Sequence, residues 1–236
     1  MRIVKTRRGV RLVEHGLVVS EVVRDPGPTH SLFDSLAAVI AALSPGVRVA
    51  VLGFAAGGLV APLRAMGFGH PLEAVDLSLE GEQIFREHSG PWVGDVRVHE
   101  DDAVRWLRRS RRRWNLILED LSVPVDRDTT KPAASIQTLP ALMKSRLAEG
   151  GVAAFNVLPV PGYAWKHLHR RIAEPWGSAQ VVEFDEWENH LLLAGALPTA
   201  RKTSRELKRH LAAIGSDQAD GLQVRTLDGR RRSLPS

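Results

Sequence analysis

Along most of the chain, short apolar runs alternate with segments whose hydrophobic residues recur at helical spacing. The run 47–52 (VRVAVL) is apolar except for one arginine and rich in Val, which is typical of a strand buried on both faces of a parallel sheet. A glycine-rich turn, a helix over 59–66 ended by Gly67 and a second strand over 72–77 follow. The pattern predicts a βαβ unit with Asp76 near the end of its second strand.

The same patterns extend over the rest of the chain. Residues 2–24 predict short antiparallel strands, and 32–43 predict a helix with one apolar face. Further strands are expected at 95–99, 114–118, 152–158, 179–184 and 191–197, and further helices at 78–87, 100–109, 133–148, 163–172 and 201–214. The last two strands are separated by too few residues for a crossover helix, so we expect them to pair antiparallel.

Three segments have a particular expectation. Pro140 predicts a kink or a restart in the helix that contains it. The polar segment 122–131 follows a strand and is expected to form a loop over a substrate site. After residue 214 the chain is polar, and we expect it to be mobile.

Composition supports one α/β domain with small additions. The 236 residues are 44% hydrophobic and 25% charged, and no apolar run has the roughly 20 residues of a membrane span. The absence of cysteine excludes disulfides, thiol catalysis and thiolate metal ligands. The first residues are basic without an apolar stretch behind them, so no signal peptide is predicted, and a cytoplasmic location is the default.

The net charge of +5 is unevenly distributed, because arginines cluster in 105–113 and 201–232. Such patches can attract nucleic acid. The preferred interpretation is that they are solvated helix surfaces, since no zinc-finger or RNA-binding signature accompanies them. Nucleic acid is therefore not a favoured partner.

The glycine-rich turn indicates which ligand the βαβ unit could bind. Its glycines, Gly53, Gly57 and Gly58, lack the G-x-G-x-x-G spacing of dinucleotide sites, and only Arg64 in this unit is basic. A carboxylate at Asp76 suits the two hydroxyls of a ribose, which donate to it. The unit is therefore typical of a site for a nucleoside with little or no phosphate, such as S-adenosylmethionine. The alternative is that the glycines only allow close packing of helix on strand.

Four segments carry a resemblance to a known family: VAVLGFAAGGLV, LEAVDLS, VRVHEDDAVRWL, and WNLILEDLSVP with the later LMKSRLAEGGVAAF. They resemble the spermidine synthase family, the aminopropyltransferase branch of the class I S-adenosylmethionine-dependent methyltransferase superfamily. The resemblance covers roughly 10–197. It implies a Rossmann-like α/β fold with a seven-stranded, mostly parallel sheet whose last strand is antiparallel. It divides the chain into a short β region (1–28), a methyltransferase-like domain (29–198) and a basic helix with a tail (199–236).

The resemblance also implies a site and its ligands. The donor substrate would be S-adenosylmethionine or its decarboxylated form, the acceptor a small molecule that the sequence does not identify, and the assembly a homodimer. Asp120 is the candidate catalytic residue. The candidate donor-binding residues are Gly53, Ala55, Gly57, Asp76, Leu77, Asp102 and Ala103.

The sequence departs from the family's pattern at positions that take part in the family's reaction. Ala56 stands where the family has the aspartate that holds the amine of the donor, and Val123 stands at the position of the catalytic base. No counterpart of the family's amine-binding Tyr-Gln or Tyr-His pair is found in 29–34. Aminopropyl transfer, methyl transfer to another acceptor and a non-catalytic nucleoside-binding role all stay open. The histidines have no metal-ligand spacing, so no metal site is predicted.

Overall fold

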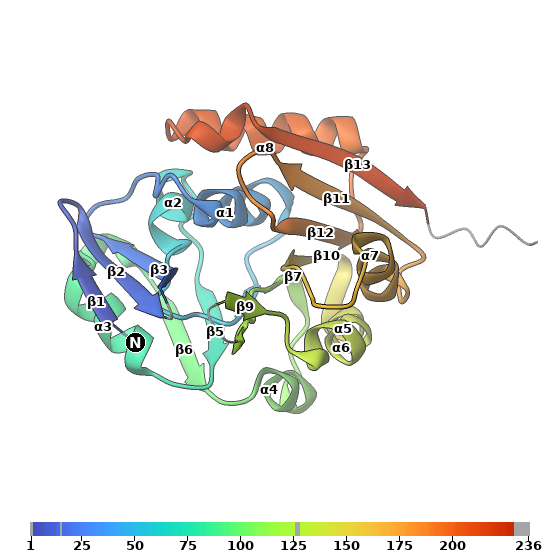
Figure 1. The fold of residues 1–236 in the computed structure, drawn as a ribbon, viewed down its shortest axis with the longest axis horizontal. Coiled ribbons are helices and arrows are strands. Elements are labelled where there is room, and N and C mark those ends of the chain that lie inside the picture. The colour runs from blue at the N-terminus through green and yellow to red at the C-terminus, as the bar shows by residue number, and fades with distance from the viewer. Residues whose placement is uncertain (1, 15, 126–127, 229–236) are drawn as a thin grey trace, which may run out of the picture.

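The computed structural model describes residues 2–14, 16–125 and 128–228. Its centre is an eight-stranded sheet in the order β13-β11-β12-β10-β7-β4-β5-β6 (Figure 1). The strands β6, β5, β4, β7 and β10 are parallel to one another, and β12 is antiparallel between β10 and β11. The bounds are β4 Val49–Leu52, β5 Leu72–Asp76, β6 Val96–Glu100, β7 Trp114–Glu119, β10 Leu147–Val157, β11 Ser178–Phe184, β12 His190–Gly195 and β13 Leu222–Asp228.

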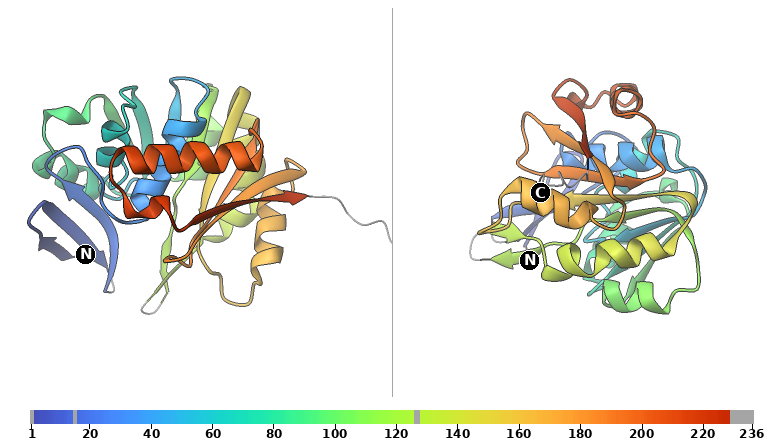
Figure 2. Two further views of the ribbon diagram at one scale, coloured as in Figure 1. Left: turned by 90° about the horizontal axis from the view of Figure 1, so that it is seen from above. Right: turned by 90° about the vertical axis from the view of Figure 1, so that its right-hand side faces the viewer.

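Helices cover both faces of this sheet (Figures 1 and 2). One face packs against α1 (Leu32–Leu43), α2 (Val60–Ala65), α3 (Glu80–His88) and α8 (Ala200–Ala213). The other packs against α4 (Ala103–Arg109), α5 (Ala133–Gln137), α6 (Leu139–Arg146) and α7 (Trp165–Ala173). All four residues of β4 are buried, and they alternate between the two hydrophobic clusters. This alternation explains why an unbroken apolar run was required there.

Most expected elements form within a few residues of their predicted bounds, for identifiable local reasons. Helix α1 begins where the Ser31 side chain accepts a hydrogen bond from the Phe33 amide. The expected helix over 133–148 is divided into α5 and α6, and Pro140 lies in the first turn of α6. Segment 122–131, expected as a loop, contains the short antiparallel strands β8 (Val123–Val125) and β9 (Asp128–Thr130), while residues 126–127 lie outside the described residues.

The segment after α8 differs from the expected polar, mobile tail. A 3₁₀ turn, η2 (Asp217–Ala219), is followed by β13, which pairs with the whole length of β11 and adds an eighth strand to the seven expected. Leu222 is buried on the sheet face that carries α8. The strand was missed because its few apolar residues are interrupted by polar ones, and pairing with β11 supplies its order. Residues 229–236 of the expected tail lie outside the described residues.

The N-terminal strands β1 (Arg2–Lys5), β2 (Gly9–Glu14) and β3 (Leu17–Val23) form a separate antiparallel sheet, as predicted. Val10, Leu12 and Val22 belong to the same hydrophobic cluster as α1 and α2. The small sheet is therefore packed against the rest of the chain. Within the described ranges, no helix has the length and hydrophobicity needed to cross a membrane.

Candidate functional site

The glycine-rich turn begins at Gly53, at the carboxyl end of β4. Gly53 has a φ of 90°, and a Cβ there would lie 2.6 Å from the Asp120 carbonyl oxygen. Its amide donates to the Val75 carbonyl over 2.9 Å. The turn is thus held between the ends of β5 and β7, and only glycine fits its first position.

Ala55 is the second unusual residue of the turn, because it has a φ of 47° without being glycine. It is half-buried, and its carbonyl oxygen packs on α3, where a Cβ on Gly81 would lie only 1.7 Å from that oxygen. Left-handed backbone costs an L-residue roughly 1 kcal/mol. The turn therefore stores strain next to the candidate donor site.

Replacing Ala55 with glycine should relieve this strain. We expect Ala55→Gly to raise the free energy of unfolding by about 0.5 kcal/mol, since the gain of about 1 kcal/mol is partly offset by backbone entropy. Urea denaturation measures the change. The matched control Ala212→Gly, on the exposed surface of α8, should lower stability by about 0.5–1 kcal/mol. A loss of stability in both variants would contradict the prediction.

Asp76 contacts the turn directly. Its Oδ2 accepts hydrogen bonds from the amides of Phe54 (2.8 Å) and Ala55 (2.9 Å), and its Oδ1 accepts a longer one from the Ser78 amide (3.4 Å). Oδ1 keeps the acceptor capacity that a ribose hydroxyl would require.

The middle of the turn faces the protein interior. Ala56 is fully buried, and Ser20 Oγ, from the N-terminal sheet, accepts hydrogen bonds from the amides of Ala56 (3.3 Å) and Gly58 (3.2 Å). Gly57 is buried against the ring of Phe54. Ala56 and Gly57 are therefore packed in the protein interior, whereas Gly53 and Ala55 are partly accessible to solvent.

The remaining expected donor-binding residues lie beside Asp76. Leu77 is 73% exposed. The Asp101 amide donates to the Asp76 carbonyl over 3.0 Å, which brings the start of α4 next to β5. Asp102 caps α4 by accepting from the Arg105 amide (2.9 Å), and Ala103 is buried in the first turn. The fold thus places the start of α4, which contains Asp102, next to the end of β5.

Asp120 follows β7 and lies next to Gly53. Its Oδ1 accepts a hydrogen bond from Asn156 Nδ2 (2.7 Å), and Asn156 Oδ1 accepts one from Asn189 Nδ2 (2.9 Å). Burial raises the pKa of Asp120 to about 6, against the lowering effects of the Asn156 hydrogen bond and of Lys131. The two asparagines were not predicted, although Asn156 is the one polar residue in the apolar run 152–158.

The raised pKa of Asp120 predicts how the stability of the protein depends on pH. Because folded Asp120 holds its proton to a higher pH than the unfolded chain does, its contribution to the free energy of unfolding should fall as pH rises from about 4 to 6. Asp120→Asn should remove this dependence and stabilise the protein at pH 7 by about 1–3 kcal/mol. Denaturation of both proteins at several pH values measures the difference. A difference that does not change with pH would contradict the prediction.

Glu119, the residue before Asp120, points to the opposite face of the sheet and is fully buried. Its Oε1 accepts from Lys131 Nζ (2.8 Å), Ser135 Oγ (2.8 Å) and the Leu121 amide (3.0 Å). Lys131 also donates to the Leu121 carbonyl. This ion pair fixes the base of the β8–β9 hairpin, on which Val123 is 36% exposed.

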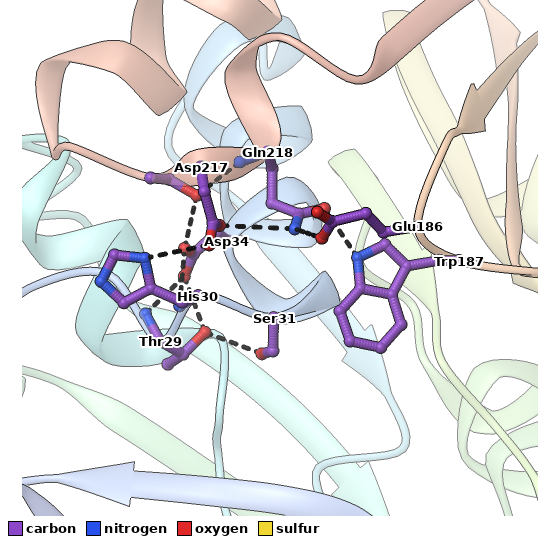
Figure 3. Close-up of polar contacts among 9 residues, drawn as sticks. Thr29, His30, Ser31, Asp34, Glu186, Trp187, Asp217 and Gln218 are labelled. Carbon is purple, nitrogen blue, oxygen red and sulfur yellow. Dashed lines mark hydrogen bonds and ion pairs between the residues drawn. The ribbon is translucent and has the colours of Figure 1, made fainter.

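A second polar cluster joins the start of α1 to the C-terminal segment (Figure 3). The fully buried carboxylate of Asp34 accepts hydrogen bonds from the Thr29 amide and hydroxyl (both 2.7 Å), the His30 amide (3.1 Å) and Ser216 Oγ (2.6 Å). Gln218 accepts from the Trp187 indole over 2.8 Å. In this structure, segment 29–34 therefore connects the start of α1 to the C-terminal segment through hydrogen bonds.

Two histidines contact each other where β12 begins. His169 of α7 and His190 are joined by a 3.0 Å hydrogen bond between their ring nitrogens, and the Trp165 ring stacks on His190 at 3.9 Å. Burial lowers the pKa of His169 to about 4, so the pair is neutral at pH 7. Among the described residues, no three His, Cys, Asp or Glu side chains form a group able to hold a metal ion.

Comparison with known proteins gives structural matches only: no protein-family model and no curated protein matches this sequence. Human methyltransferase-like protein 13, in complex with SAH, superposes with a TM-score of 0.59 at 16% identity over 77% of this chain and 90% of that chain. A spermidine synthase in complex with the transition-state analogue AdoDATO gives a TM-score of 0.58 at 12% identity over 80% and 66% of the two chains. A SAM-dependent methyltransferase from Agrobacterium tumefaciens gives 0.53 at 13% identity over 70% and 62%.

These identities are low, so the likeness concerns the fold. Strand order, the antiparallel β12 and the helices on both faces agree with the α/β architecture that the sequence predicted. The chain has the Rossmann-like fold of class I methyltransferases, preceded by a three-stranded antiparallel sheet.

Proposed function

We propose that this chain is a transferase that binds an adenosyl sulfonium donor, S-adenosylmethionine or its decarboxylated form, at the carboxyl edge of the sheet. The observation that carries the proposal is the position of Leu77, a 73% exposed leucine that directly follows Asp76 at the end of β5. An apolar side chain in that place offers a surface for adenine, while Asp76 Oδ1 accepts from the ribose. The matched methyltransferase and spermidine synthase were solved with SAH and with AdoDATO.

The chemistry needs little from the protein beyond positioning. The nucleophile of the acceptor attacks a carbon bonded to the positive sulfur, the carbon–sulfur bond breaks, and a neutral thioether leaves. Where the nucleophile carries a proton, Asp120 is the carboxylate available to accept it, because position 123 is valine and Glu119 is paired with Lys131. Asp102, at the start of α4, would accept from the adenine amino group.

Ligand-dependent stability tests donor binding. We expect S-adenosylhomocysteine at about 100 times its Kd to add about 2.7 kcal/mol to the free energy of unfolding, which raises Tm by about 5–10 °C. ATP is the control, and it should have a smaller effect because Arg64, the basic residue of the βαβ unit, is bonded to the carbonyls of Val93, Phe68 and His70. Absence of stabilisation by any adenosyl ligand would favour a non-catalytic protein.

Methyl transfer is the second candidate, and Val123 favours it. A polyamine acceptor requires carboxylates to replace its hydration, and the position that supplies one in spermidine synthases is occupied here by an exposed valine. Incubation with each donor and a set of amine, hydroxyl and carboxylate acceptors, followed by mass spectrometry, separates the two functions. An aminopropyl gain supports the first, and a methyl gain supports the second.

A further inference from the structure

Two side-chain amides form a series of hydrogen bonds that ends at the Asp120 carboxylate. Asn156, near the end of β10, donates to Asp120 Oδ1 over 2.7 Å, and Asn189, just before β12, donates to Asn156 Oδ1 over 2.9 Å. The three residues lie in or next to the neighbouring strands β7, β10 and β12, at the carboxyl ends of the parallel strands. They are separated by 33 and 36 positions in sequence, so the contact exists only in the folded protein.

The two hydrogen bonds of Asn156 determine how its side-chain amide is oriented. Asn156 is only 7% exposed, so water has little access to replace either partner. Rotating its amide by half a turn would place its oxygen against the Asp120 carboxylate and its NH₂ group against that of Asn189. While Asp120 is ionised, Asn156 therefore presents a donor to Asp120 Oδ1. Over the described residues, no hydrogen bond to Asp120 Oδ2 accompanies it.

We propose that Asn156 and Asn189 are positioning residues of the transferase site, which hold Asp120 Oδ1 and leave Oδ2 to accept the proton of the acceptor substrate. The inference rests on the proposed function for its chemical meaning. The orientation of Asp120 itself rests on the hydrogen bonds of the ligand-free protein. Asn156 acts through Asp120 and has no assigned contact with substrate.

The charges around Asp120 determine what the amides contribute. Burial and the neighbouring carboxylates of Glu119 and Asp76 favour the protonated form, while Asn156 and the Lys131 ammonium favour the ionised form. Removing the Asn156 amide takes away one of the two interactions that keep the carboxylate charged. A larger fraction of Asp120 would then be protonated at pH 7, and fewer molecules would have an ionised base.

The experiment compares Asn156→Leu with the control Asn115→Leu. Asn115 is also an asparagine of the central sheet. It lies near the amino end of β7, away from Asp120, and its Oδ1 accepts from the Arg48 amide over 3.1 Å. The carboxyl carbon of Asp120 is followed by ¹³C NMR through a pH titration of the ligand-free proteins. We expect the pKa of Asp120 to rise by about 1–2 in Asn156→Leu, which corresponds to loss of a hydrogen bond to a charged group. The control should titrate as the wild type does.

Activity supplies a second readout. With whichever donor and acceptor the wild type accepts, product formation by Asn156→Leu should fall about fourfold at pH 7 and recover by about pH 9, because the base is then ionised again. A purely structural defect would lower the rate at every pH. Asn189→Ala, at the half-buried end of this series, should shift the profile in the same direction by less.

Several results would overturn the proposal. They are an unchanged Asp120 titration in both Asn156→Leu and Asn189→Ala, an equal change in Asn115→Leu, or a rate loss that is the same at pH 7 and pH 9. Should Asn156→Leu fail to fold, the titration of Asn189→Ala decides. A wild type that no adenosyl ligand stabilises would instead overturn the proposed function, and the NMR titration would still report the coupling between the amides and Asp120.

Discussion

Asp76→Asn is expected to weaken binding of an adenosyl donor about 100-fold while leaving the protein folded. The ionised carboxylate would accept hydrogen bonds from ribose hydroxyls, and a hydrogen bond to a charged group contributes about 1.5–3 kcal/mol. An asparagine oxygen can still accept from the Phe54 and Ala55 amides, so the glycine-rich turn should persist. Titration calorimetry with S-adenosylhomocysteine measures the affinity.

Two further variants separate binding from stability. Asp76→Ala removes the acceptor altogether and should also lower the free energy of unfolding by about 2–3 kcal/mol, because two turn amides lose their partner. Asp95→Asn is the control, since Asp95 forms an exposed ion pair with Arg97 at the amino end of β6 and should leave the affinity unchanged. Wild-type affinity in Asp76→Asn would contradict the placement of the ribose at this carboxylate.

Lys131→Met is expected to lower the free energy of unfolding by about 3–5 kcal/mol, because it leaves a fully buried Glu119 without its cation. The double variant Glu119→Gln with Lys131→Met should recover most of that loss, since it removes the charge along with its partner. Urea denaturation measures stability, and amide hydrogen exchange should show faster exchange in the β8–β9 hairpin of the single variant. Arg225→Ala, which breaks the exposed pair with Glu183, should cost less than about 1 kcal/mol.

A small effect of Lys131→Met, comparable to that of Arg225→Ala, would show that the buried pair contributes no more than a surface pair. Failure of the double variant to recover stability would show that Lys131 acts through its packing and its bond to the Leu121 carbonyl. Either result would show that the ion pair alone does not hold the base of the β8–β9 hairpin.

The fold could be predicted from local patterns because those patterns determine each element separately. The all-buried alternation of β4, the serine cap of α1 and the proline in α6 act within a few residues of where they occur. Asp76, Leu77 and Asp102 were expected in one site because of the resemblance to the spermidine synthase family, and the parallel pairing of β5 with β6 brings their segments to the same end of the sheet. Strand β13 could not be predicted, since its order comes from pairing with β11.

The inner parts of the site depend on contacts between distant segments. Ser20 binds the amides of Ala56 and Gly58 from a separate sheet, and Asn189 reaches Asp120 through Asn156. No spacing rule connects such positions. Gly57, a predicted donor-binding residue, is buried against Phe54, and no local pattern around Ser20 indicates its contact with the turn.

The hydrogen bond between Asp34 and Ser216 has a consequence for the order of folding. It joins residues 182 positions apart, and it completes the set of partners around a carboxylate that is fully buried in the finished protein. During synthesis from the N-terminus, α1 can form long before Ser216 leaves the ribosome, but the start of that helix keeps an incompletely bonded charge until then. The segment that closes the beginning of α1 is therefore made 182 residues after the carboxylate that it completes.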